Sequence, residues 1–220
     1  MTLETIEVQT TDSPRATIIV LHGLGADGHD FEPICDELDL AAVGGVRFVL
    51  PHAPVRPVTI NGGYAMRAWY DIRGTAIDRQ EDEAGLRDSQ RDIEALIAKE
   101  VARGIPASRI VLMGFSQGCA MALLTGLRHR ERLAGLVGLS GYLPLLSTTE
   151  AERSEANALV PIFMAHGRQD PVVPIARAEA ARDELQRLGY APQWQAYDMQ
   201  HAVHPQEITA LNRWLLGVLA

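Results

Sequence analysis

The chain has 220 residues and a net charge of −8, and hydrophobic residues make up 47% of it, enough for one buried core. The negative charge argues against a nucleic-acid or anionic-membrane partner, because nothing would compensate the phosphates. The acidic start has no secretory signal pattern, and no apolar run approaches the roughly 20 residues of a membrane-spanning helix, so we expect a cytoplasmic protein with a single domain, residues 1–220.

Apolar runs of strand length alternate with helical patterns along the chain. The runs are rich in valine and isoleucine and nearly continuous, as expected for strands that are covered on both faces. In chain order, the predicted strands are residues 4–10, 16–21, 46–50, 109–114, 134–139, 160–165 and 192–197. The predicted helices are residues 28–39, 82–103, 117–129, 176–189 and 205–218. This alternation predicts an α/β fold with a mostly parallel central sheet, helices on both faces and the first strand at one edge.

Four of the predicted strands end shortly before a residue that can carry chemistry, namely His22, Ser116, Asp170 and His201. The carboxyl ends of parallel strands meet at one edge of a sheet, and reactive groups gather in the loops beyond that edge. We therefore expect these four side chains on the same rim of the molecule.

Ser116 lies in the motif Gly-x-Ser-x-Gly, between a predicted strand and a predicted helix. A serine on such a tight turn needs neighbours without side chains, and Gly114 and Gly118 provide that room. The helix that follows directs its N-terminal amides at the serine oxygen, where negative charge develops during acyl transfer. The motif therefore predicts Ser116 as a nucleophile.

The two cysteines, Cys35 and Cys119, are expected to be free thiols, because nothing marks the chain for secretion. Cys119 follows the serine turn closely and is a rival nucleophile, but Ser116 holds the turn position itself. No cluster of histidine, cysteine and carboxylate residues has metal-ligand spacing, so we expect no metal site.

A serine needs a base to become a nucleophile, and histidine has a suitable pKa near neutrality. His201 and His204 both lie between the last predicted strand and the last helix. A proline starts that helix, so His204 flanks it while His201 is freer to reach inward, and we predict His201 as the base. His22 and His166 each precede a glycine and are expected to make structural hydrogen bonds, whereas His129 lies in a charged run expected at the surface.

The base needs an acid that fixes its tautomer and stabilises the imidazolium. Asp170 follows the preceding strand, in the chain order of serine, acid and histidine that is typical of this arrangement. Asp198 is nearer to His201 in sequence, but too near to turn onto its ring. We therefore predict Asp170 as the third member of a triad.

Two backbone amides are needed to stabilise the oxyanion, and we predict those of Gln117, directly after the nucleophile, and of Leu24. Leu24 lies in a glycine-rich turn, residues 23–28, that also fits the Gly-x-Gly-x-x-Gly pattern of dinucleotide-binding proteins. That alternative is disfavoured, because residues 46–54 contain no acid that could bind a ribose. No cofactor is expected.

Together these residues resemble the phospholipase/carboxylesterase family, which includes acyl-protein thioesterases and small bacterial carboxylesterases. The motifs that carry the resemblance are Leu21–Gly28, Leu50–Pro54, Asn61–Gly63, Ala68–Ile72, Gly114–Gly118, His166–Gly167 and Asp170–Pro171. The resemblance implies an α/β-hydrolase fold without a large cap domain and a serine hydrolase that needs no cofactor.

The same resemblance implies the roles of individual residues. It gives Ser116, Asp170 and His201 as the triad and the amides of Leu24 and Gln117 as oxyanion donors. It also implies an acyl chain that runs past Leu24, the segment Trp69–Arg73, Tyr142 and Val173. Tyr142 and Val173 also follow strand ends on the expected rim, whereas Trp69 fits a core position equally well.

The chain departs from the family pattern at three positions. Gln200 and Cys119 stand where the family usually has glycine, before the histidine and after the serine turn respectively. Arg73 places a charge where members that act on long acyl chains tend to be apolar. The last departure favours shorter acyl groups.

The sequence therefore predicts a serine esterase that acts on small carboxylic esters or acyl thioesters of short to medium chain length. A thioesterase or lysophospholipase acting on long acyl chains is the first alternative. Transfer of the acyl group to an alcohol or thiol acceptor is a second, because it shares the acyl-enzyme. A non-catalytic binding module is disfavoured, since all three triad residue types are present in order.

Overall fold

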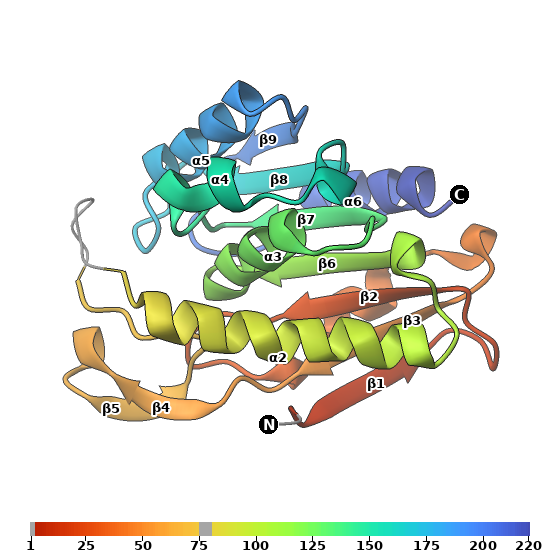
Figure 1. The fold of residues 1–220 in the computed structure, drawn as a ribbon, viewed down its shortest axis with the longest axis horizontal. Coiled ribbons are helices and arrows are strands. Elements are labelled where there is room, and N and C mark those ends of the chain that lie inside the picture. The colour runs from red at the N-terminus through yellow and green to blue at the C-terminus, as the bar shows by residue number, and fades with distance from the viewer. Residues whose placement is uncertain (1–2, 75–80) are drawn as a thin grey trace.

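A seven-stranded sheet forms the centre of the molecule (Figure 1). This computed structural model describes residues 3–74 and 81–220. The strands lie in the order β1-β3-β2-β6-β7-β8-β9, in which β1 pairs antiparallel with β3 and every other neighbouring pair is parallel. Their bounds are β1 (Thr5–Gln9), β2 (Ala16–Leu21), β3 (Val46–Pro51), β6 (Ile110–Phe115), β7 (Gly135–Leu139), β8 (Ile162–Gly167) and β9 (Gln193–Tyr197).

The predicted strands are confirmed, with small shifts at their ends. Every residue of β2, β3, β7 and β8 is buried, which explains their continuous hydrophobicity. β8 starts at Ile162 rather than at residue 160, because Pro161 has no amide hydrogen to donate to the ladder. The first strand, β1, lies at the sheet edge as predicted.

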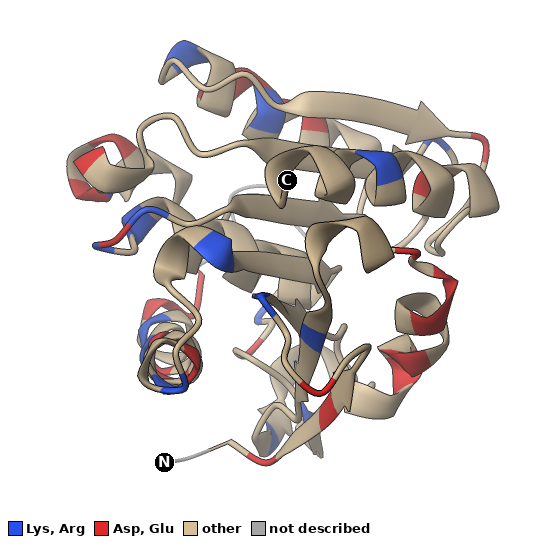
Figure 2. Cartoon of the chain, turned by 90° about the vertical axis from the view of Figure 1, so that its right-hand side faces the viewer, with Lys and Arg blue, Asp and Glu red and all other residues tan. Residues whose placement is uncertain are grey.

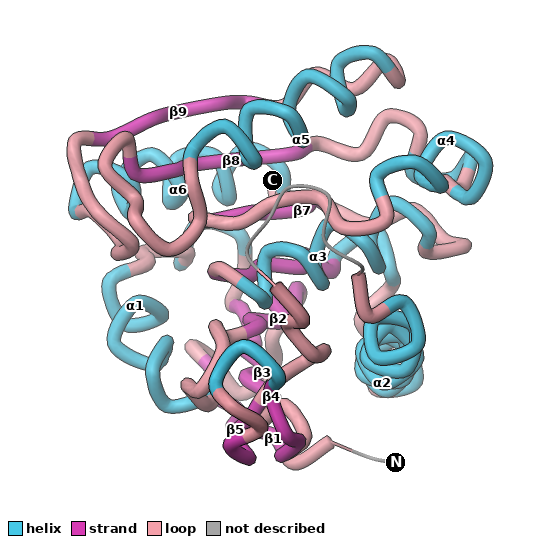
Figure 3. The backbone as a smooth tube through the Cα atoms, turned by 90° about the vertical axis from the view of Figure 1, so that its left-hand side faces the viewer, coloured by secondary structure: helices cyan, strands magenta, loops and turns pink. Residues whose placement is uncertain are grey.

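Helices cover both faces of the sheet (Figures 1 and 3). Buried side chains of α2, α3 and α5 belong to one hydrophobic cluster, and those of α1 and α6 belong to a second cluster on the opposite face. The helix bounds are α1 (Glu32–Glu37), α2 (Glu83–Ala102), α3 (Gln117–Arg128), α4 (Thr149–Glu152), α5 (Ile175–Arg187) and α6 (Pro205–Val218). Four of the five predicted helices therefore match α2, α3, α5 and α6 closely.

The helix predicted at 28–39 is wrong in its first part. Residues Gly28–Phe31 form a 3-10 turn, and α1 begins only at Glu32. Asp27 and Asp30 form a reciprocal capping box that closes this tight turn. Pro33 is the second residue of the α-helix, and proline is well accommodated in the first helical turn.

A two-stranded hairpin, β4 (Val55–Val58) and β5 (Tyr64–Arg67), was not predicted. Its strands have four residues each and include Pro57, which obscures the strand pattern. The signal that could have identified it is the Asn-Gly-Gly turn, in which Gly62 and Gly63 both have positive φ. The hairpin lies beside the loops that carry the predicted site residues (Figure 3).

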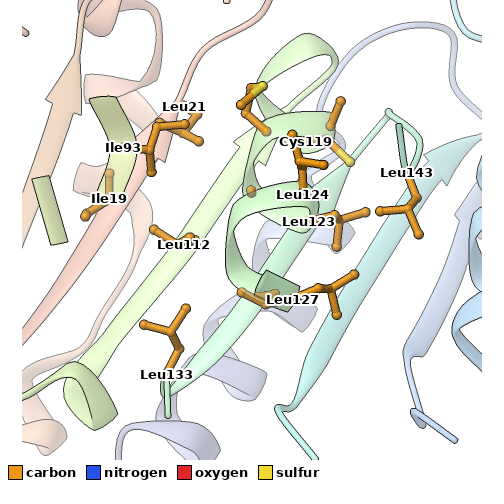
Figure 4. Packing of buried hydrophobic residues seen from close by; sticks show 14 of the residues in the cluster. Ile19, Leu21, Ile93, Leu112, Cys119, Leu123, Leu124, Leu127, Leu133 and Leu143 are labelled. Carbon is orange, nitrogen blue, oxygen red and sulfur yellow. The ribbon is translucent and has the colours of Figure 1, made fainter. Parts of the chain in front are cut away.

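The buried helix α3 fixes the position of the serine turn. Figure 4 shows Leu123, Leu124 and Leu127 of α3 packed within the larger hydrophobic cluster. Cys119 is a free, fully buried thiol, and a Cβ atom on Gly141 would lie 2.4 Å from its Cβ. The cysteine that departs from the family pattern is thus accommodated by a glycine in the loop after β7.

Charged residues lie mainly on the helices and loops, while most of the sheet contains none (Figure 2). The expectation that His129 lies at the surface is wrong. His129 is only 4% exposed, and its Nδ1 atom lies 2.6 Å from Glu94 Oε2 on α2. The neighbouring arginines made the segment look like a solvated run, but the histidine between them points inward.

Candidate active site

Ser116 occupies a sharp turn between β6 and α3. Its φ of 56° lies in the left-handed region that residues with a Cβ atom rarely adopt. The turn is possible because positions 114 and 118 are glycines. A Cβ atom on Gly114 would lie 2.1 Å from the Gly118 oxygen, and one on Gly118 would lie 2.0 Å from the Leu21 oxygen, so side chains at these positions would clash. The backbone N–H of Ser116 donates to Leu139 O at 2.8 Å. These contacts hold the hydroxyl at the rim of the sheet.

The structure brings Ser116, His201 and Asp170 together from three separate loops. The Oγ atom of Ser116 lies 2.9 Å from His201 Nε2, and His201 Nδ1 lies 2.7 Å from Asp170 Oδ2. The ring of Phe115 contacts the imidazole, with centroids 4.8 Å apart. This is the geometry in which an imidazole can take a proton from a hydroxyl while a carboxylate fixes its tautomer.

Asp170 is held in place by the loop that follows β8. Its Oδ1 atom accepts hydrogen bonds from the amides of Val172 and Val173 at 2.8 and 2.9 Å, and its side chain is fully buried. His166 Nε2 donates to Val173 O at 2.8 Å, and burial lowers the pKa of His166. A neutral His166 therefore braces the same loop, which confirms the structural role predicted for it.

His204 lies outside the triad and caps α6 instead. Its Nδ1 atom accepts a hydrogen bond from Gln206 N, and Glu207 Oε2 accepts one from His204 N, which completes a capping box. The structure therefore places His201, and not His204, beside Ser116. Gln200, which replaces the usual glycine, does not prevent His201 from reaching Ser116.

The capping box predicts an unusual pH dependence of stability. Burial raises the pKa of Glu207 from its ordinary value of 4.5 to about 7, against the hydrogen bond from His204 N. Between pH 4.5 and about 7, the folded state keeps a proton on Glu207 that the unfolded state has lost. The free energy of unfolding is therefore highest below pH 4.5 and decreases as the pH rises to about 7. Glu207→Gln removes this dependence. The free energy of unfolding of the variant, relative to that of wild type, should therefore increase by about 3 kcal/mol from pH 5 to pH 8.

Urea unfolding at the two pH values measures this difference. Glu37→Gln is the matched control, because Glu37 is exposed, and its stability relative to wild type should not change with pH. A Glu207→Gln difference that stays constant from pH 5 to pH 8 would show that the buried carboxyl group is not neutral.

Leu24 and Gln117, the predicted oxyanion donors, line the same cavity as Ser116. Gln117 is the first residue of α3, where backbone N–H groups have no partner within the helix. Among the described residues, no acceptor takes a hydrogen bond from the Leu24 N–H. His22, on the same turn, accepts a hydrogen bond from Ala53 N through Nε2 and lies 2.7 Å from Gly23 O through Nδ1, which confirms its structural role.

A cavity of about 300 Å³ opens at Ser116. Its wall includes the predicted residues Leu24, Tyr142 and Val173. The full set of lining residues is Leu24, Ile60, Asn61, Tyr70, Ile72, Ser116, Gln117, Tyr142, Pro171, Val172, Val173, Pro174 and Arg177. Such a volume lies at the lower end of the range for ligand pockets.

Two residues predicted to bind substrate do not line this cavity. Trp69 is fully buried, and its Nε1 donates to His22 O at 2.9 Å, so it belongs to the core and supports the glycine-rich turn. Arg73 pairs with Asp82 at 2.8 Å and with Asp71 at 3.5 Å. From the predicted segment, Tyr70 and Ile72 line the cavity instead.

A second cavity of about 490 Å³ meets the first at Leu24, Ser116 and Val172. Its wall is mostly apolar and includes Phe31 and Ile34, which follow the glycine-rich turn in the chain. Ser116 thus lies in the wall of both cavities.

Neither a metal cluster nor a membrane-spanning helix is found in the described part of the chain. Within residues 3–74 and 81–220, no three histidine, cysteine or acidic side chains are placed to hold a metal ion. No helix in these ranges is long and apolar enough to cross a membrane.

Comparisons with known proteins point to one family. Its model, described as Phospholipase/Carboxylesterase, matches residues 3–218. The chain is 43% identical over 210 residues to acyl-protein thioesterase 1 of Neurospora crassa, covering 91% of this chain and 85% of that protein. The crystal structure of SOBER1 from Arabidopsis thaliana is 29% identical with a TM-score of 0.89, covering 94% of this chain and 100% of that one. Acyl-protein thioesterase 2 of Zea mays is 28% identical with a TM-score of 0.87, covering 99% of both chains.

Proposed function

Because this chain belongs to the phospholipase/carboxylesterase family of serine hydrolases, we propose that it cleaves carboxylic esters and thioesters of short- to medium-chain acyl groups with Ser116, His201 and Asp170. The observation that carries the proposal is the continuous hydrogen-bonded path from Ser116 Oγ through His201 to Asp170, at 2.9 and 2.7 Å. No cofactor is needed for this chemistry.

The first half of the proposed reaction forms an acyl-enzyme. Ser116 Oγ attacks the acyl carbon while His201 Nε2 accepts its proton, and Asp170 stabilises the imidazolium that results. The amides of Leu24 and Gln117 donate to the oxygen that becomes negative. His201 then protonates the leaving alcohol or thiol. In the second half, His201 takes a proton from water, which attacks the acyl carbon of the acyl-enzyme. His201 then returns the proton to Ser116 Oγ as the acid is released.

The two cavities that meet at Ser116 support a division of the substrate. The cavity of about 300 Å³, lined by Tyr70, Ile72 and Tyr142, receives the acyl group, and the cavity of about 490 Å³ receives the leaving group. The small volume of the first favours short to medium acyl chains.

Deacylation of acylated proteins is the second candidate. It is favoured by the relatives, since the Neurospora crassa and Zea mays proteins are named acyl-protein thioesterases. A cysteine thioester passes through the same acyl-enzyme, so this candidate differs in acyl length and leaving group rather than in mechanism.

Hydrolysis of two matched substrate series separates the candidates. Oxygen esters of p-nitrophenol and thioesters of N-acetylcysteamine, each from acetyl to palmitoyl, are compared by kcat/KM with the Ser116→Ala rate subtracted. We expect a maximum between about four and ten acyl carbons in both series, because the acyl cavity is at the lower end of the pocket range. A rate that rises to palmitoyl in the thioester series would favour the acyl-protein substrate, and no serine-dependent rate in either series would refute the hydrolase.

A further inference from the structure

Arg177 places a charge in the wall of the cavity that receives the acyl group. Of the described residues lining this cavity, it alone carries a charge, and no aspartate or glutamate accompanies it. Around it the wall is formed by apolar side chains, by the hydroxyl groups of Tyr70, Ser116 and Tyr142, and by the uncharged residues Asn61 and Gln117. The cavity is therefore mostly apolar, with one cationic group in its wall.

No carboxylate of the described residues lies within ion-pair distance of Arg177. Two other arginines of α5 do have acid partners, since Arg182 pairs with Asp183 at 2.7 Å and Arg187 pairs with Glu184 at 2.7 Å. Arg177 is also only the third residue of α5, where the helix dipole disfavours a cation. Neither an ion pair nor the helix dipole explains this position, and such departures are expected at functional sites.

The guanidinium of Arg177 is held flat against an aromatic ring. Its carbon lies 3.5 Å from the centroid of the Tyr142 ring, and the Tyr142 hydroxyl lies 2.7 Å from the hydroxyl of Tyr70. Stacking uses the face of the guanidinium, whereas its N–H donors point outward in the plane. The stacked arrangement therefore holds the plane of the guanidinium while leaving the donors along its edge for a ligand.

From this arrangement we infer that the acyl cavity selects acyl groups whose far end carries a carboxylate, and that Arg177 recognises that carboxylate. The substrate class is the monoesters or monothioesters of aliphatic dicarboxylic acids. The apolar wall contacts the methylene chain, and the planar fork of Arg177 pairs with the terminal carboxylate. This inference rests on the proposed hydrolase function and concerns its acyl specificity. In the reaction, Ser116 Oγ forms a bond to the acyl carbon, and the alcohol or thiol leaves with the bonding electrons and takes a proton from His201. Water then adds to the acyl carbon, Ser116 Oγ leaves and regains its proton, and the free dicarboxylate is released.

Two pairs of p-nitrophenyl esters test the inference. The hydrogen adipate is paired with the 6-methylheptanoate, and the hydrogen suberate with the 8-methylnonanoate. Within each pair the acyl groups have the same length, and each ends in a carbon with two terminal heavy atoms, oxygens in the carboxylate and methyl groups in the neutral ester. They therefore differ only in the charge and polarity of that end. For the pair whose length fits, Arg177→Met should lower kcat/KM of the carboxylate ester about tenfold or more and change that of the neutral ester by less than about threefold. Arg177→Lys retains the charge without the planar fork, so its kcat/KM for the carboxylate ester should lie between those of wild type and Arg177→Met.

Arg182→Met is the matched control. Arg182 lies on the same helix and also faces an aromatic ring, 5.2 Å from that of Trp194, but it does not line the cavity. Its substitution should leave the ratio of the carboxylate ester to the neutral ester unchanged. Thermal unfolding of each variant verifies that it is folded.

The outcomes separate this inference from the proposed function. If Arg177→Met changes both esters of each pair by the same factor, Arg177 does not recognise the carboxylate and the inference is wrong, while Ser116-dependent hydrolysis of the neutral esters keeps the proposed function. If neither ester shows a Ser116-dependent rate, the proposed function and this inference are both wrong.

Discussion

Ser116→Ala is expected to lower kcat/KM for p-nitrophenyl esters by roughly 10³- to 10⁶-fold. Alanine keeps the Cβ atom, so the strained turn, in which residue 116 has a φ of 56°, should form as before. The residual rate comes from substrate binding and from the oxyanion donors. The variant should also show no burst of p-nitrophenol, because no acyl-enzyme can form. Stopped-flow absorbance measures the burst, and steady-state rates give the loss.

Cys119→Ala is the control for this result. Cys119 is the other nucleophilic side chain near the turn, but burial raises its pKa to about 12, so the thiol stays protonated at neutral pH. Its substitution should leave kcat/KM within a few-fold of wild type. Retention of the burst in Ser116→Ala together with its loss in Cys119→Ala would assign the nucleophile to the cysteine.

Much of the α/β-hydrolase fold was predictable from the sequence, because burial of the central sheet leaves a hydrophobic pattern along the chain. Strands covered on both faces are continuous apolar runs, and this pattern gave the order of strands and helices. The same topology brings Ser116, Asp170 and His201 to one rim, since each follows the carboxyl end of a strand. Only general rules of parallel sheets were needed to bring these three residues together.

The lining of the acyl cavity was harder to predict, because it depends on which way individual side chains face. Trp69 and Tyr70 are adjacent in sequence, yet Trp69 supports the core while Tyr70 lines the cavity. The side chain of Gln117 fixes this segment through hydrogen bonds to Trp69 N and Tyr70 O. No periodic pattern reports such contacts between residues 47 or 48 positions apart.

Charged residues were misjudged for a related reason. Arg73 appeared as a charge in the acyl path, but Asp71 and Asp82 neutralise it outside the cavity. Arg177 falls within the helix predicted at 176–189 and was not singled out, yet it lines the cavity without an acidic partner among the described residues. Whether a charge is compensated depends on contacts between distant segments, which composition and spacing do not report.

Asp170→Asn is expected to lower kcat/KM by about 10⁴-fold, through the tautomer of His201. Two backbone amides, those of Val172 and Val173, donate to Asp170 Oδ1 and would retain the oxygen of an asparagine at that position. The amide nitrogen would then face His201 Nδ1 and donate to it. The proton of a neutral His201 would consequently lie on Nε2, which could no longer accept the proton of Ser116. Since asparagine has the shape of aspartate, thermal unfolding should show a folded variant.

Asp198→Asn tests the same argument at the competing acid. Asp198 is nearer to His201 in sequence, but its side chain is 82% exposed and faces Arg168 at 3.4 Å. A carboxylate in that position, paired with an exposed arginine, does not orient the His201 imidazole, so its amide variant should keep kcat/KM within about twofold of wild type. A loss in Asp198→Asn as large as that in Asp170→Asn would mean that the imidazole changes its acid partner during the reaction. A loss in Asp170→Asn alone would show that the loop after β8, with its two backbone amides, sets the tautomer on which the proposed proton transfer depends.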